Sequence, residues 1–396
     1  MPLRIAVWVL VLTAGAAALG YGQDSDLTDE QRRELERIAT LGYVTGSDPA
    51  PEDAGVTVYD PDACEGYTIY ASRGHPGAFL IDMNGRVLHS WQEDGPKEWT
   101  RVWACRDGGI LAISADPARL AKLDSESNLV WTYGGTDLSA HHDFQVQPDG
   151  RIFVLMRRPR YLTWFRKSPL QVDMLCILEP DAEAVRVTDC LSIPEAFRDS
   201  EYAHMLSADW FLKGGDPFHT NSVEVLDGRI PHPAFVSGNI LVSIRNMDCL
   251  AVIDPQERAV VWVSRGRWQR QHEARVTPSG HVLLFDNRTF DGQSRIVEYD
   301  VRSDEIVWSY SDDGFYSLGA GAQQLLANGN VLVTESQKGR IFEVARDGRV
   351  VWEYVNPRRI NDGRTIVRFT RAYRVPYDYF QGDFGDRLPS GQGRSE

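Results

Sequence analysis

The sequence predicts an all-β protein, a six-bladed β-propeller preceded by a signal peptide and a short helix. With 396 residues, 42% of them apolar and 25% charged, the chain is long enough for a sizeable core. A hairpin ending in tryptophan recurs along the chain, and a second hairpin type with a tight glycine turn alternates with it. From residue 55 onward the pattern is β almost without a break.

Residues 1–22 have the features of a targeting segment. Arg4 precedes an apolar run from Ile5 to Gly20, and small residues follow it. This charge and length are typical of a secretory signal peptide, which predicts an exported protein, periplasmic or extracellular. An uncleaved N-terminal membrane anchor is the alternative, because an apolar run of this length nearly crosses a thin bilayer.

Residues 23–54 are expected to form a short helix and a linker. Leu35, Ile38 and Leu41 recur at helical spacing, and Thr28 is placed to cap the helix. The prolines and acids that follow mark the linker.

Internal repeats decide the architecture of the remaining chain. Trp91 and Trp131 are 40 residues apart, Trp262 and Trp308 are 46 apart, and Trp308 and Trp352 are 44 apart. These spacings fit four strands per propeller blade.

Six blades are expected within residues 55–380. The five tryptophan hairpins account for five of them, and a hairpin without tryptophan over residues 174–187 completes the set. The β pattern at 365–375 is expected to join the first blade and close the ring, which also hides the sheet edges. Residues 381–396 are expected to form a flexible tail.

The glycine-turn hairpins carry histidines in one register. His142 and His272 each precede a turn glycine by eight residues, and His219 shares their His-x-x-x-Val spacing. Because the first strand of each blade lines the central channel, we expect the three side chains to converge. A single buried histidine is usually a structural residue, whereas three in register favour chemistry.

An arginine or asparagine follows each of these histidines on the next strand. Seven residues beyond the turn glycine stand Arg157, Arg245 and Asn287. An arginine fork binds an oxyanion through several hydrogen bonds, and a structural ion pair is the alternative. Arg157 also opens a basic and aromatic interruption over 157–215, either a positively charged lid or a solvated loop.

Cysteine content and net charge narrow the function classes. The five cysteines are too few and scattered for a disulfide scaffold or a Cys-x-x-Cys zinc site. If one pair forms a disulfide, Cys176 and Cys190 are the best candidates, since they lie at opposite ends of one predicted hairpin. The net charge of −14 argues against nucleic-acid binding, which needs a basic surface.

Taken together, these motifs resemble those of the arylsulfate sulfotransferase (arylsulfotransferase) family. The similar segments are His141-His142-Asp143, Phe218 to Val223, Arg245-Asn246, Gln271 to Ala274 and Leu284 to Asn287. The resemblance implies a small-molecule aryl sulfate donor, a phenolic acceptor and a sulfohistidine intermediate, without a metal or cofactor.

The resemblance also implies roles for particular residues. By motif order His272 would be the nucleophile, while His142, His219 and Arg245 would bind and polarise the ester. The substrate-binding residues would be Asn221, Asn246, Asn287 and Arg157.

Two other classes compete with this interpretation. Three histidines on neighbouring strands suit zinc with an open fourth position, although a nearby arginine would repel the cation. A non-catalytic exported propeller that serves as a scaffold or ligand-binding protein is the other alternative.

Overall fold

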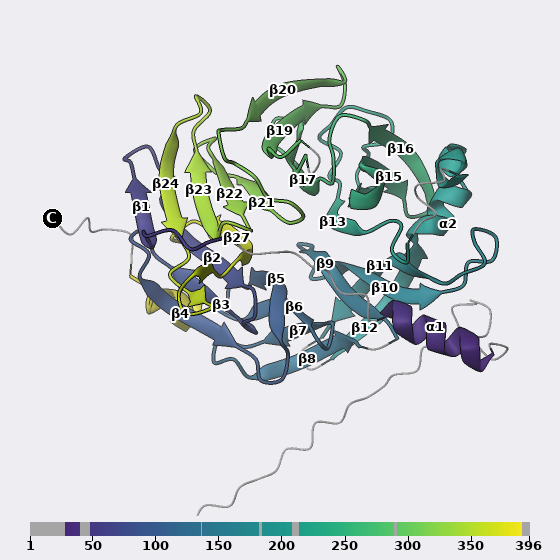
Figure 1. Cartoon of the computed structure of the whole chain (residues 1–396), viewed down its shortest axis with the longest axis horizontal. Coiled ribbons are helices and arrows are strands. Elements are labelled where there is room, and N and C mark those ends of the chain that lie inside the picture. The colour runs from purple at the N-terminus through teal and green to yellow at the C-terminus, as the bar shows by residue number, and fades with distance from the viewer. Residues whose placement is uncertain are drawn as a thin grey trace, which may run out of the picture.

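The computed structural model describes residues 28–39, 48–135, 137–181, 184–207, 214–288 and 291–389. Within them, six antiparallel sheets surround a common axis and form the predicted six-bladed propeller (Figure 1). The expected signal peptide lies outside the described residues. No helix in the described ranges is both long and apolar enough to cross a membrane.

Blades 1 to 3 come from the first half of the chain together with its last strand. From the axis outward, blade 1 contains β27 (Phe369–Val375), β2 (Tyr67–Ser72), β3 (Gly77–Ile81) and β4 (Val87–Gln92). Blade 2 contains β5 (Glu98–Ala104), β6 (Ile110–Ala115), β7 (Arg119–Leu123) and β8 (Leu129–Gly134). Blade 3 contains β9 (Ser139–Val146), β10 (Ile152–Arg160), β11 (Leu170–Pro180) and β12 (Val185–Ser192).

Blades 4 to 6 follow in chain order. Blade 4 contains β13 (Thr220–Val225), β14 (Ile240–Ile244), β15 (Cys249–Asp254) and β16 (Ala259–Arg265). Blade 5 contains β17 (His272–Val276), β18 (Val282–Asp286), β19 (Arg295–Asp300) and β20 (Glu305–Tyr310). Blade 6 contains β21 (Ala322–Leu325), β22 (Val331–Glu335), β23 (Arg340–Val344), β24 (Val350–Val355) and β1 (Gly55–Tyr59).

Two strands far apart in the sequence close the ring. β27 pairs with β2 as the inner strand of blade 1, as the sequence predicted. β1 adds a fifth, outer strand to blade 6 by pairing with β24, which the sequence did not predict. Both ends of the propeller domain are therefore held by backbone hydrogen bonds.

Burial follows the position of a strand within its blade. Every residue of β14, β18 and β22, the second strands of blades 4 to 6, is buried, because both faces pack on neighbouring blades. The outermost β20 instead alternates between exposed and half-buried residues along most of its length.

The repeated tryptophans join successive blades. The indole N–H of Trp91 in blade 1 donates to the carbonyl of Gly108 in blade 2 at 2.8 Å. Trp352 in blade 6 donates in the same way to Met83 beside blade 1 at 2.9 Å. At these two positions the tryptophan that recurs along the sequence therefore forms a hydrogen bond from one blade to the next.

The N-terminal helix α1 (Asp29–Ala39) is capped as predicted. Thr28 N–H donates to Gln31 Oε1 at 2.8 Å, and Gln31 N–H donates to Thr28 Oγ1 at 3.2 Å, which is a reciprocal capping box. The helix lies beside β10 (Figure 1), where the Tyr161 hydroxyl donates to the Gln31 carbonyl at 3.4 Å.

Two expectations about irregular segments are corrected. The interruption expected from residue 157 contains blade strands, so Arg157, Arg158 and Arg160 lie on β10 and not in a lid. The interruption also contains the short helix α2 (Ile193–Arg198) and the 3₁₀ helix η2 (Glu201–Ser207). Two short strands, β25 (Arg359–Ile360) and β26 (Thr365–Ile366), pair with each other before β27.

The flexible tail expected from residue 381 instead begins with the helix α3 (Gly382–Asp386). Phe384 on this helix is buried in the same core as Trp91. The hydroxyl of Tyr67 donates to the carbonyl of Pro389 at 2.5 Å, which extends the ordered chain beyond the helix. Burial of this phenylalanine contributes to holding the segment on the propeller.

The predicted disulfide is present. Cys176 on β11 and Cys190 on β12 are bonded and directly paired across the two strands, with their Cα atoms 4.1 Å apart. Cys64, Cys105 and Cys249 are free thiols.

Candidate active site

Irregular inner strands present the three histidines. On β9, His141, His142 and Asp143 lie opposite the single residue Leu155, so this stretch bulges from the sheet. On β17, Glu273 and Ala274 lie opposite one residue, and this bulge follows His272 directly. Such bulges redirect side chains, and here they bring residues of neighbouring blades together.

The histidines converge, but not from one register as the sequence predicted. His142 and His272 each lie four residues before the last pair of their inner ladder, at Val146 and Val276. In blade 4 the last pair is at Val225, so the equivalent residue is Asn221, and His219 precedes it by two residues. His219 directly precedes the first residue of β13 and reaches the other two histidines from there.

A hydrogen-bonded chain joins two of the histidines to a carboxylate. Nε2 of His142 lies 3.0 Å from Nε2 of His219. Nδ1 of His219 lies 2.8 Å from Oδ2 of Asp216, whose side chain is 15% exposed. A carboxylate oxygen only accepts, so Nδ1 of His219 carries a proton.

His272 is held by an asparagine in a fixed tautomer. Its Nδ1 lies 2.7 Å from Oδ1 of Asn287. The Asn287 amide donates to the carbonyls of Ser317 at 2.7 Å and Ala320 at 3.0 Å, which fixes which amide atom is the oxygen. Nδ1 of His272 must therefore donate, so the neutral ring has its lone pair on Nε2.

Arg245 lies on the turn that follows β14, in the 3₁₀ helix η3 (Arg245–Met247). Its Nη1 donates to Oδ1 of Asn246 at 2.8 Å, and the same oxygen accepts from Arg270. The Asn246 amide donates to the backbone carbonyl of Asp216 at 2.7 Å. One asparagine thus connects two guanidinium groups with the segment that precedes His219.

The electrostatics of the cluster keep the histidines neutral. Burial lowers the pKa of His272 to about 3, and the positive charge of Arg245 adds to this effect. Burial also lowers the pKa of His142 well below its usual range, as do neighbouring His219 and His141. Neutral imidazoles are available there as nucleophiles and proton acceptors at neutral pH.

Asp216 is an acidic partner of this chain of rings. Burial raises the pKa of its carboxyl group, but the hydrogen bond and charge of His219 and the charge of Arg157 outweigh burial and lower it overall. For His219, burial lowers the pKa more than Asp216 raises it. The resting cluster therefore contains a carboxylate beside two neutral imidazoles.

The predicted polar residues occupy different places around the histidines. Asn221 is buried and donates its amide to the carbonyl of Gln271 at 2.8 Å, next to His272. Arg157, in the second half of β10, lowers the pKa values of His142 and Asp216 through its charge. The amides of Asn221, Asn246 and Asn287 all bind protein groups, so each can position a neighbour.

A buried ion cluster lies directly behind the histidines. Asp143, which follows His142, accepts from Arg101 at 2.7 Å and from Arg275 at 2.5 Å. Glu273, which follows His272, contacts Arg101 at 3.2 Å and Arg275 at 2.8 Å, and also pairs with Arg371. These five side chains, here called the axial ion cluster, anchor both histidine-bearing bulges.

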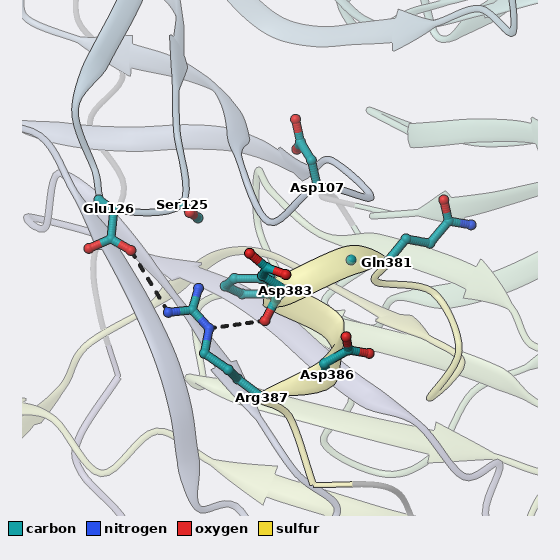
Figure 2. Close-up of a pocket in the computed structure, with 9 residues that line it drawn as sticks. Asp107, Ser125, Glu126, Gln381, Asp383, Asp386 and Arg387 are labelled. Carbon is teal, nitrogen blue, oxygen red and sulfur yellow. Dashed lines mark hydrogen bonds and ion pairs between the residues drawn. The ribbon is translucent and has the colours of Figure 1, made fainter.

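The zinc alternative and a surface hollow beside α3 can be compared with this site. Within the part of the chain that the structure describes, no group of three His, Cys, Asp or Glu side chains is arranged to hold a metal ion. A hollow beside α3 is lined by Asp107, Glu126, Asp383 and other residues, with Arg387 paired to Glu126 at 4.0 Å (Figure 2). It contains none of the predicted site residues.

The fold and site define a class: six-bladed propellers in which the inner strands and neighbouring turns bring histidines and an arginine together. The chain belongs to the arylsulfotransferase (ASST) family, whose model matches residues 104–357. The match includes all three histidines, Arg245 and Asp216. Membership implies small-molecule aryl sulfate and phenol substrates. Comparison with curated proteins gave no match.

Solved structures are similar to this chain at low sequence identity. A protein of unknown function from Bacteroides caccae is 14% identical, with a TM-score of 0.52, over 78% of this chain and 99% of that chain. A virginiamycin B lyase from Staphylococcus aureus is 11% identical, with a TM-score of 0.45, over 79% of this chain and 87% of that chain. The Dos1 propeller is 12% identical, with a TM-score of 0.42, over 81% and 77% respectively.

Proposed function

We propose that this protein transfers a sulfuryl group from an aryl sulfate to a phenol through a sulfohistidine on His272. Family membership supports sulfotransferase activity in general. The observation that carries the choice of nucleophile is the hydrogen bond from Nδ1 of His272 to Asn287 at 2.7 Å. It directs the lone pair to Nε2, the nitrogen that must attack sulfur.

The first half-reaction forms the intermediate. Nε2 of His272 attacks the sulfur, the bond between sulfur and the aryl oxygen breaks, and the phenol leaves after taking up a proton that comes from solvent through a nearby imidazole. Arg245 lowers the pKa of His272 through its charge, so it lies within electrostatic reach of that ring. A guanidinium there offsets the negative charge of the sulfate oxygens during transfer.

The second half-reaction reverses these steps with the acceptor. The acceptor phenol loses its proton to a nearby imidazole, its oxygen attacks sulfur, and the bond between nitrogen and sulfur breaks. His272 returns to its neutral form. His142 and His219 are the imidazoles placed to carry the proton, since their Nε2 atoms are 3.0 Å apart and linked to Asp216.

The test is a single-turnover experiment with an aryl sulfate and no acceptor. We expect a burst of about one equivalent of phenol per protein and an adduct of one sulfuryl group, found on His272 by mass spectrometry. His272→Asn should abolish both, while His142→Asn and His219→Asn should slow the burst but leave an adduct. An adduct on another histidine would reassign the nucleophile, and turnover without an adduct would exclude this mechanism.

We further propose that the protein acts outside the cytoplasm. The disulfide between Cys176 and Cys190 supports this, because disulfides persist in oxidising compartments. Cell fractionation, with N-terminal sequencing of the mature protein, tests the location and cleavage of the signal peptide. Recovery of full-length protein from the cytoplasm with both cysteines reduced would contradict it.

A further inference from the structure

We propose that Lys122 and Cys105 form an oxidative crosslink, in which one oxygen atom joins the Lys122 nitrogen to the Cys105 sulfur. The pair lies in blade 2, where Lys122 is on β7 and Cys105 directly follows β5. Nζ of Lys122 donates to Sγ of Cys105 at 2.9 Å. The reactant is a peroxide, and the proposal does not depend on the sulfotransferase function.

The lysine amine is placed against the sulfur in a largely buried position. The side chain of Lys122 is 19% exposed, whereas lysine side chains are mostly surrounded by water. The carboxylate of Asp107 is 4.0 Å from Nζ, and the same oxygen accepts from the N–H of Gly109 at 2.9 Å. The sulfur of Cys105 is therefore a closer partner of this amine than the carboxylate.

Gly109 provides the space that this arrangement needs. A Cβ atom at this position would lie 2.7 Å from Nζ of Lys122 and 2.8 Å from the carbonyl oxygen of Leu123. Gly109 does not have a positive φ, so its backbone conformation alone does not require glycine. The glycine is explained by the close approach of β7, including the amine that contacts Cys105.

The turn that carries Cys105 is fixed from two sides. The N–H of Cys105 donates to the carbonyl of Gly109 at 2.7 Å. From the C-terminal segment, the hydroxyl of Tyr379 donates to the carbonyl of Ala104 at 2.7 Å. The sulfur is thus presented to Lys122 by a turn whose backbone is held in place, which favours a reaction between the two side chains.

The pair is accessible to a small oxidant. Cys105 is half-buried, and Asp107 on the same turn lines the hollow beside α3 (Figure 2). Burial raises the pKa of the Cys105 thiol, whereas the charge and the hydrogen bond of Lys122 lower it. The thiolate is the form that reacts with a peroxide, so Lys122 supports the first oxidation as well as the crosslink.

The bond changes balance with two molecules of hydrogen peroxide. The first adds an oxygen atom to the thiolate and gives a sulfenic acid, while the Lys122 ammonium group supplies the proton that completes the released water. The second removes two more electrons as the sulfenic oxygen bonds to the neutral amine, and two more water molecules leave. Sulfur and nitrogen each lose two electrons, and each peroxide gains two.

The separation of the two atoms favours a bridge through oxygen. An oxygen atom bonded to both fits between nitrogen and sulfur at 2.9 Å with little movement, whereas a direct bond draws the two atoms much closer together. The bridge connects the end of β5 with β7 across β6. It stabilises blade 2 by closing the chain between residues 105 and 122, and it protects the thiol from irreversible oxidation.

The test treats the purified protein with hydrogen peroxide and maps its peptides by mass spectrometry. We expect the peptide of Cys105 to be joined to that of Lys122, with a gain of one oxygen and a loss of two hydrogens, about 14 Da. Thermal unfolding should shift to a higher temperature in the crosslinked protein. Dithiothreitol should reverse both changes, because a thiol reduces the bond between sulfur and oxygen.

Lys122→Arg is the matched variant, because it keeps the positive charge but removes the amine. It should form no crosslink, and its Cys105 should be oxidised to a sulfinic acid that dithiothreitol does not reverse. Cys64→Ser is the control. It removes another half-buried thiol, whose backbone N–H donates to Glu343 at 2.8 Å, and should leave the crosslink unchanged. Thermal unfolding of the untreated variants shows that they are folded.

Three outcomes would overturn the proposal. The wild type could oxidise Cys105 to a sulfinic acid without a crosslink, as expected for Lys122→Arg. A crosslink that is two hydrogens lighter and contains no added oxygen would show a direct bond in place of the bridge. A Cys105 thiol that stays reduced in peroxide would show that the pair is inert. The burst experiment on His272 decides the sulfotransferase function separately.

Discussion

Asn287 determines whether His272 presents the correct nitrogen. Its oxygen accepts from Nδ1 of His272 at 2.7 Å, and two backbone carbonyls fix the amide. Asn287→Ala removes this bond, worth roughly 1 kcal/mol, so the burst should slow about fivefold. The adduct should still form on His272. Asn330→Ala, at a buried amide that binds Glu343 instead, should leave the burst unchanged.

The pH dependence of the burst follows from the pKa of His272. Because this pKa is lowered from 6.5 to about 3, the ring stays neutral and nucleophilic well below neutral pH. With an activated nitrophenyl sulfate, the burst rate at low donor concentration should stay constant from pH 8 down to about pH 4 and then fall. A fall centred near pH 6.5 would show that His272 is not shielded from water.

The same depressed pKa also affects folding. In the unfolded chain His272 binds a proton near pH 6.5, whereas the folded protein keeps the ring neutral down to about pH 3. The contribution of this residue to stability is therefore retained above pH 6.5 and lost as the pH falls between these values.

The site residues differ in how far the sequence could reveal them. His142 and His272 were predictable because both occupy one repeat position. His219 was found through a spacing that the folded ladder does not share, since Asn221 occupies the equivalent place. Asp216 belongs to no repeat and was not predicted, although its position three residues before His219 could have indicated a partner. The hydrogen-bonded chain from His142 through His219 to Asp216 depends on ring orientations that a sequence pattern does not contain.

At the scale of elements, the disulfide joins the two outer strands of blade 3. Cys176 and Cys190 close a loop of 14 residues. A double Cys→Ala variant at these positions should lower the free energy of unfolding by about 3 kcal/mol, because the unfolded chain regains the entropy of that loop. Denaturant unfolding measures this, and a reducing agent should destabilise only the wild type. Equal sensitivity of both proteins to reduction would contradict the assignment.

The helix α3 gives a second element-scale prediction. Phe384 is 5% exposed and packs against His89 and Phe380 with ring centroids 4.9 and 5.0 Å apart. Phe384→Ala should cost about 3 kcal/mol of stability, as expected for a buried aromatic residue. Arg387→Ala, on the exposed side of the same segment, should change it by less than about 0.5 kcal/mol. Equal effects of the two substitutions on stability would show that this segment behaves as a flexible tail and is not packed on the propeller.

Short elements were the ones that the sequence did not reveal. A helix of five residues such as α3 is too short for a hydrophobic period, so its single buried phenylalanine gave no signal. β1 was missed because strand pairing across nearly the whole chain length leaves no local pattern. The basic residues at the end of β10 concealed the continuation of a strand whose first half is apolar.

At the scale of the whole molecule, one polar cluster joins all six blades. Arg371, Arg101, Asp143 and Glu273 of the axial ion cluster come from blades 1, 2, 3 and 5. Blade 4 contributes the N–H of Val223, which donates to Asp143 at 2.9 Å. Blade 6 contributes the amide of Gln323, which donates to the carbonyl of Glu273 at 2.7 Å. His142 and His272 are each followed directly in the sequence by a carboxylate of this cluster, so the integrity of the ring and the geometry of the site are coupled.

Asp143→Asn tests this coupling. Removing the carboxylate leaves the buried guanidinium groups of Arg101 and Arg275 with Glu273 as their one shared carboxylate in this cluster, which should cost about 3 kcal/mol. Arg86→Ala, which breaks an exposed pair with Asp82, is the control and should cost less than about 1 kcal/mol. Because all six blades meet at the cluster, tryptophan fluorescence and far-UV circular dichroism should report one coincident unfolding transition in denaturant. Two separate transitions, or a loss no larger than that of Arg86→Ala, would show that the blades are held together elsewhere.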